Sequence, residues 1–88
     1  MDVVEPIQEF RISQYARFQM DRLDIHLSEI RGILRNPRLV SLERPGLAVY
    51  QDRILTDDPK HVFSLRIFVN IHATPPEVVS VDRTGLGR

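Results

Sequence analysis

The sequence predicts an α+β fold in which two N-terminal helices pack on one face of a four-stranded antiparallel sheet. The apolar residues recur with a helical period up to about residue 36, and beyond Pro37 they alternate with polar residues. The clearest alternation lies in residues 61–72, HVFSLRIFVNIH, and predicts a central strand with one buried and one partly polar face. Helices followed by a run of strands are typical of a two-layer α+β domain.

Composition narrows the classes of function. The chain has no cysteine, and its three histidines lie far apart in sequence, so we expect no metal site and no cofactor. The net charge is zero, which gives no electrostatic case for strong nucleic-acid binding. No apolar run approaches the length of a membrane span, and the first residues lack the pattern of a signal peptide. A cytoplasmic location without a membrane partner is therefore expected.

The 88 residues are enough for one domain with a modest core. We expect a flexible leader over residues 1–9, a single domain over residues 10–85 and a short tail over residues 86–88. Within the domain, residues 10–12 are compatible with a short extra N-terminal strand.

The first helix is predicted to begin after Ser13, which can cap it, and to run to about residue 22 or 23. At 100° per residue, one narrow stripe faces the core and a second stripe lies beside it. The core stripe contains Ala16, Met20 and Leu23. The second stripe contains Tyr15, Phe18 and Arg22. This second stripe is either an aromatic shoulder of the core with a solvated arginine or part of a functional site.

The second helix is predicted to begin at His26, which we interpret as a capping position rather than a ligand. Asn36-Pro37 ends the helix, because the residue before a proline avoids the helical region. The apolar face of the helix contains Leu27, Ile30, Ile33 and Leu34.

Beyond the second helix the pattern predicts strands over residues 38–43, 47–55, 61–72 and 77–83. Arg44-Pro45-Gly46-Leu47 places proline and glycine where a type II turn requires them. The polar segment 56–60 and the proline-containing segment 73–76 are the other predicted turns. The strands therefore follow one another as an antiparallel meander.

The polar face of the central strand carries Arg66, Asn70 and His72. A strand rises about 3.3 Å per residue, so Arg66 and His72 are separated by about 20 Å. They can flank an extended ligand, but they cannot act together as a catalytic pair.

The last strand narrows the role of Arg66. Val79 and Val81 are expected to face the core, which places Asp82 on the polar face. One allowed hairpin register sets Arg66 opposite Asp82, and another sets it opposite Thr84. In the first register the two side chains form a cross-strand ion pair worth about 0.2–1 kcal/mol.

Several segments resemble a small bacterial domain family of unassigned function that is related to the RelE/ParE toxin superfamily and the BrnT-like toxins. They are YARFQMDRLDIHLSEIRGILRNP, RPGLAVYQDRI, SLRIFVNIHATPPEVVSV and DRTG, and together they span about residues 12–85. The resemblance implies a RelE-like domain that acts as the toxin of a toxin–antitoxin module. Its partners would be a small antitoxin protein, laid across the open sheet, and RNA or the ribosome.

The resemblance also implies site residues. The family's catalytic arginines fall on Arg66 and Arg83, where a positive fork would stabilise the transition state of RNA cleavage without a metal. The general base would be Tyr50, with Tyr15 or a histidine as alternatives; Tyr50 completes the candidate catalytic set. The candidate RNA-binding residues are Arg22, Tyr15, Arg53 and His72.

Two hypotheses follow. In the first, the chain is a toxin that cleaves RNA, similar to the mRNA interferases. In the second, it is a non-catalytic RelE-like module that grips a protein partner with the open sheet or with the second stripe of the first helix. The second hypothesis is motivated by the neutral charge and by Tyr15, which stands where family members usually carry a histidine.

Overall fold

The structure, a computed structural model, describes residues 4–55 and 62–85. The predicted turn at 56–60, the start of the central strand at His61 and the tail at 86–88 lie outside the described residues. The elements in chain order are β1 (Arg11–Ile12), α1 (Gln14–Leu23), α2 (Leu27–Arg35), β2 (Leu39–Arg44), β3 (Leu47–Leu55), β4 (Val62–Asn70) and β5 (Glu77–Gly85).

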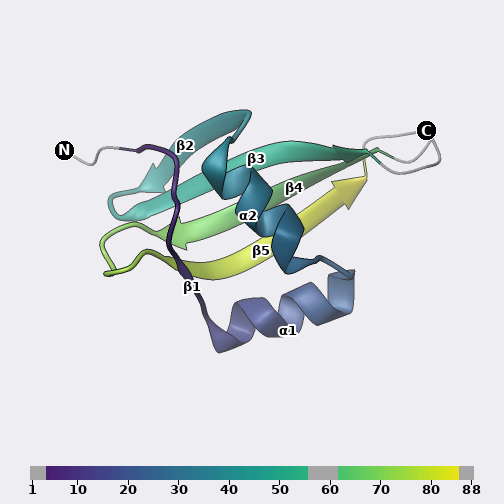
Figure 1. The fold of residues 1–88 in the computed structure, drawn as a ribbon, viewed down its shortest axis with the longest axis horizontal. Coiled ribbons are helices and arrows are strands. Elements are labelled where there is room, and N and C mark those ends of the chain that lie inside the picture. The colour runs from purple at the N-terminus through teal and green to yellow at the C-terminus, as the bar shows by residue number, and fades with distance from the viewer. Residues whose placement is uncertain (1–3, 56–61, 86–88) are drawn as a thin grey trace.

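The strands form one mixed sheet in the order β1-β5-β4-β3-β2. The helices lie to one side of it, with α2 across the sheet and α1 beside β5 (Figure 1). The α+β class, the two helices and the antiparallel meander of β2 to β5 are as predicted. The sheet has a fifth strand, however, because β1 pairs with β5 in parallel. The short extra N-terminal strand expected over residues 10–12 is therefore confirmed, and its parallel pairing makes the sheet mixed where a purely antiparallel sheet was predicted.

Both helices begin and end where the sequence predicts. The hydroxyl of Ser13 accepts a hydrogen bond from the N–H of Ala16 at 3.0 Å and so caps α1, which ends at Asp24 in the left-handed region. His26 is the N-cap residue of α2, and its N–H donates to Oε1 of Glu29 at 2.8 Å. Neither helix of the described chain is long and apolar enough to cross a membrane.

The hydrophobic core lies between the sheet and the two helices. The central strand contributes Leu65, Ile67 and Val69 to it, each at most 1% exposed, as the alternating pattern predicts. The turn before β3 has the predicted type, since Gly46 adopts a φ of 83°. The other buried core residues are Ile7, Ile12, Ala16, Ile25, Ile30, Ile33, Leu34, Ala48, Tyr50, Val78 and Val81.

A β-bulge in β5 corrects one core prediction. Val78 is fully buried, whereas Val79, which we expected in the core, is only partly buried. Val69 pairs with Val78 and the preceding Phe68 pairs with Ser80, so Val79 is the extra residue of the bulge. The bulge changes which side chains of β5 face the helices.

The segment before β1 also differs from the prediction of a flexible leader, because residues 4–9 are bound to the domain. Ile7 is 7% exposed, and its N–H donates to the C=O of Leu34 at 2.8 Å. That carbonyl lies in the last turn of α2, where no helical N–H is available to it. The hydroxyl of Tyr50 donates to the C=O of Glu5 at 2.6 Å. Residues 4–9 therefore cap α2 and close one side of the core.

Candidate functional site

The polar face of the sheet is occupied at its centre by an ion pair. Arg66 of β4 lies opposite Asp82 of β5, in the first of the two predicted registers, and its Nη2 donates to Oδ2 of Asp82. Both side chains remain partly accessible, at 44% and 40% exposed. The guanidinium of Arg66 also lies over the ring of Phe68, 5.7 Å from its centre. The guanidinium of Arg66 is thus already held by two neighbours within the sheet, Asp82 and Phe68.

The other two expected catalytic residues lie on the opposite face. Arg83 is the cross-strand neighbour of Leu65, which faces the core, and its guanidinium lies 4.5 Å from the centre of the Phe63 ring. Tyr50 is 1% exposed, among the core residues. Because successive side chains of a strand point to opposite faces, Arg66 cannot share one substrate with Arg83 and Tyr50. The structure does not assemble the catalytic set expected from the resemblance.

Tyr50 has a structural role. Burial raises the pKa of its hydroxyl above the ordinary value of 10.0, and the negative charge of Glu5 adds to the increase. A hydroxyl that keeps its proton at neutral pH and donates it to a backbone carbonyl is not a poised general base. Beside it, a groove of about 870 Å³ runs between residues 5–10, Arg31 and the turn at 74–76.

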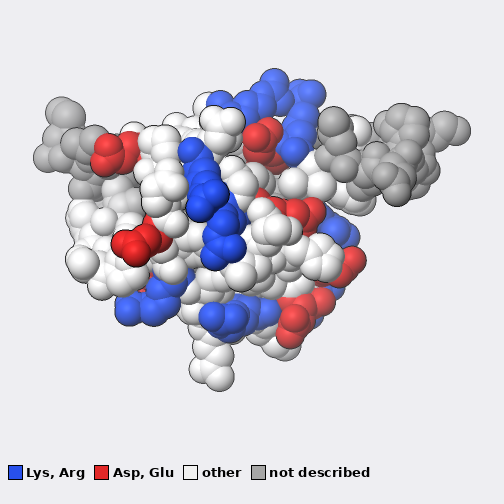
Figure 2. Space-filling view, in the orientation of Figure 1, with Lys and Arg blue, Asp and Glu red and all other residues white. Residues whose placement is uncertain are grey.

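The four expected RNA-binding residues do not form one surface. Tyr15 and Arg22 lie on α1, whereas Arg53 lies on β3 and His72 lies in the turn after β4, beside Gly46. Arg53 and His72 are at opposite ends of the sheet, since Arg53 pairs with Ser64 and β4 ends at residue 70. On the face seen in Figure 2, basic side chains lie in several places with acidic side chains between them. On that face the described residues therefore form no single basic track for a nucleic acid.

The second stripe of α1 is the part of the candidate set that the structure does bring together. We call Tyr15, Phe18 and Arg22 the α1 stripe. Tyr15 is 62% exposed and Phe18 is 57% exposed, so they are not an aromatic shoulder of the core. The guanidinium of Arg22 lies over the Phe18 ring, 5.9 Å from its centre. Two aromatic side chains and an arginine therefore share one exposed surface.

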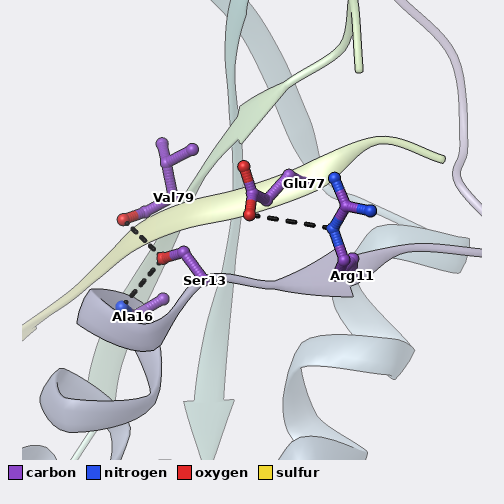
Figure 3. Close-up of polar contacts among 5 residues, drawn as sticks. All are labelled: Arg11, Ser13, Ala16, Glu77 and Val79. Carbon is purple, nitrogen blue, oxygen red and sulfur yellow. Dashed lines mark hydrogen bonds and ion pairs between the residues drawn. The ribbon is translucent and has the colours of Figure 1, made fainter. Parts of the chain in front are cut away.

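The α1 stripe sits on a helix that is fixed to the edge of β5. The N–H of Ser13 donates to the C=O of Val78 at 2.9 Å. The hydroxyl of Ser13 donates to the C=O of Val79 at 3.2 Å (Figure 3). Two turns further along α1, Oε1 of Gln19 accepts a hydrogen bond from the N–H of Val81 at 2.9 Å. Two of these bonds reach backbone groups at the bulge of β5, and the third reaches one beyond it. The helix is thereby held at two points along the strand.

Comparisons with protein-family models, with curated proteins and with solved structures find no match to the chain. The resemblance to the RelE/ParE superfamily therefore stays a prediction. Within residues 4–55 and 62–85, no group of His, Cys, Asp or Glu side chains is arranged to hold a metal ion.

Sequence reasoning missed two residues that matter for this surface. Phe18 was placed on the second stripe but not among the candidate site residues, although 100° per residue puts it on the far side of the helix from Ala16 and not beside the core stripe as expected. Gln19 gave no signal in the sequence, because its partner is the N–H of Val81, 62 residues later in the chain.

Proposed function

We propose that the chain is a non-catalytic binding module that grips a protein partner through the α1 stripe. The observation that carries the proposal is the exposure of Tyr15 and Phe18, each more than half accessible on a helix whose other side is buried. Aromatic residues and arginine are the side chains most enriched at the centres of protein interfaces. A helix fixed to the sheet presents them with little conformational entropy to lose on binding.

The chemistry of the stripe indicates the kind of surface it would meet. Tyr15 and Phe18 would enter an apolar pocket of the partner, because burying two aromatic side chains supplies most of the binding free energy. Arg22 calls for a carboxylate at the rim of that pocket, where a bidentate contact fixes the orientation of the partner.

The RNA-cleaving alternative is weaker on geometric grounds. Its expected catalytic residues lie on two faces of the sheet, and Arg66 is already paired with Asp82. We therefore rank the binding module first.

The test is co-purification from ribonuclease-treated extracts of the source cells, followed by an affinity measurement with the purified partner. We expect a protein partner that survives ribonuclease and whose affinity falls at least about tenfold for Tyr15→Ala/Phe18→Ala, which removes the centre of the interface. Arg17→Ala, an exposed change on another side of α1, is the matched control and should bind as the wild type does. A partner that the double variant retains, or one lost with the RNA, would overturn the proposal.

A further inference from the structure

The opposite edge of the sheet is formed by β2. In the sheet order β2 is the terminal strand, and no other element of the described chain pairs with its outer side. Leu39 is 55% exposed and Leu42 is 44% exposed, so both leucines of this strand present apolar surface to solvent. An exposed edge strand with apolar side chains is a template for pairing with another chain.

The backbone groups that such a chain would meet can be identified. The C=O of Gln51 accepts a hydrogen bond from the N–H of Arg38 at 3.1 Å, so Gln51 turns its backbone groups toward β2. Leu39 is the direct neighbour of Gln51 in the ladder and turns toward β3 in the same way. Since backbone groups alternate along a strand, Val40 and Leu42 turn their N–H and C=O groups outward. Two residues of β2 therefore offer four hydrogen-bonding groups to an added strand.

The charges around β2 are mainly positive. Its side chains and near neighbours include the arginines Arg35, Arg38, Arg44 and Arg53 and the acids Glu43 and Asp52, an excess of two positive charges. None of these arginines makes an ion pair with another described residue. Arg38 and Arg53 both line a hollow of about 370 Å³ beside Leu39, and Asp52 lines it too, which leaves an excess of one positive charge there. Figure 2 shows basic side chains gathered at the margin of the molecule where β2 begins.

We propose that β2 accepts an extended acidic segment of another protein as an added strand. The main chain of the segment pairs with Val40 and Leu42, and one of its carboxylates enters the hollow between Arg38 and Arg53. The bulge at Glu43, where the β2–β3 register shifts, limits the added strand to a few residues. Specificity then comes from the charge at one end of the segment, because backbone pairing alone does not distinguish sequences.

A second copy of the chain is the main competing occupant. Two antiparallel β2 strands could pair Val40 of one copy with Leu42 of the other. Such pairing would bring together two edges that each carry an excess of two positive charges, and like charges across paired strands are destabilising. Charge complementarity therefore favours the acidic segment. This site lies at the other edge of the sheet from the α1 stripe, so the two proposals stand or fall separately.

The test uses two synthetic nine-residue peptides that alternate valine and threonine. One carries three aspartates at one end, and the other carries three lysines in their place. We expect the acidic peptide to bind at least about tenfold more tightly at low salt, with the difference shrinking as salt is added. Amide hydrogen exchange at Val40 and Leu42 should slow when the acidic peptide is bound, because their N–H groups become bonded.

Variants locate the contact. Arg38→Ala/Arg53→Ala changes only exposed side chains and should weaken the acidic peptide about tenfold, since a charge-assisted contact is lost. Arg17→Ala/Arg31→Ala removes the same charge from the helices and should leave binding unchanged. Val40→Pro should abolish binding by deleting an outward donor that the domain itself does not use.

Four results would overturn the proposal. They are equal affinities for the two peptides, no saturable binding at millimolar acidic peptide, protection of amides elsewhere than at β2, and a concentration-dependent dimer that Val40→Pro abolishes. The last result would assign the edge to a second copy of the chain. Circular dichroism of each variant shows whether lost binding reflects lost folding.

Discussion

The two edges of the sheet differ in how the outward backbone groups of the edge strands are bonded. At β5 the outward backbone groups are bonded in succession to β1, to Ser13 and to Gln19. Across the β1–β5 pair, Nε of Arg11 lies 3.8 Å from Oε2 of Glu77. At β2 the outward groups of Val40 have no such cover in the part of the chain that the structure describes. We call the β5 side the closed edge, because its bonds attach the sheet to β1 and α1. We call the β2 side the open edge, because its outward groups face away from the domain.

The contrast follows from local structure. β5 is nine residues long and contains a bulge, so without cover it would leave several backbone groups unpaired next to the core. β2 has six residues, its own bulge at Glu43 and arginines at both ends, which are the usual means of protecting an edge from aggregation. Those means discourage pairing with neutral or basic strands, and they leave an acidic strand as the chain that can still approach.

The largest effect at the closed edge is expected from Gln19→Met. The change keeps the length of the side chain but removes the acceptor for the N–H of Val81, a residue that is 1% exposed. An unsatisfied buried donor costs about 1–3 kcal/mol, measured as a lower free energy of unfolding in urea. Gln19→Glu keeps an acceptor oxygen and should retain most of the stability. Equal losses in both variants would show that the hydrogen bond does not hold the edge.

Ser13→Ala should come next, with a loss of about 1–2 kcal/mol, because it removes the cap of α1 and the bond to the C=O of Val79 together. Ser41→Ala is the matched change at the open edge, where the side chain is exposed, and should stay within about 0.5 kcal/mol of the wild type. The same denaturation experiment measures both. A Ser41 effect as large as that of Ser13 would remove the distinction between the edges.

Much of this arrangement was predictable from the sequence because it rests on local signals. Ser13 and Asn36-Pro37 bound the helices, Gly46 fixes the turn before β3, and strict alternation along β4 identifies the buried face. Each of these signals acts within a few residues. The register between Arg66 and Asp82 was one of two expected from the length of the β4–β5 turn.

The rest depends on contacts between distant segments. In Glu77-Val78-Val79-Ser80-Val81, two adjacent valines leave the parity of the strand undetermined, and only the bulge decides that Val78 is buried. The polar residues before β1 resemble a leader, although the partner of that segment, the C=O of Leu34, lies at the end of α2. The expected catalytic set came from the resemblance, which gives positions along the chain and not the faces on which side chains lie.

Tyr50→Phe tests how residues 4–9 are held to the domain. Losing the hydrogen bond to Glu5 should cost about 1 kcal/mol at neutral pH. The pKa of Tyr50 is raised above 10.0 in the folded state, mainly by burial, so its contribution is present below pH 10 and is lost as the pH rises through the folded pKa. The stability difference between wild type and Tyr50→Phe should therefore shrink above pH 10. A difference that stays constant from pH 7 to beyond that point would show that folding does not raise the pKa of Tyr50.

The smallest effect is expected from the ion pair between Arg66 of β4 and Asp82 of β5, on the polar face of the sheet. A double-mutant cycle of Arg66→Ala and Asp82→Ala should give a coupling of about 0.2–1 kcal/mol, because both side chains are well exposed to solvent. The register there is already set by the bulge and by α1, so the pair adds little.

The same variants separate the two functional hypotheses in cells. As a binding module, the wild-type chain should not arrest growth when its expression is induced, and Arg66→Ala should leave affinity at the α1 stripe unchanged. Growth arrest that Arg66→Ala relieves while the domain stays folded would return the site to the sheet and favour RNA cleavage over binding.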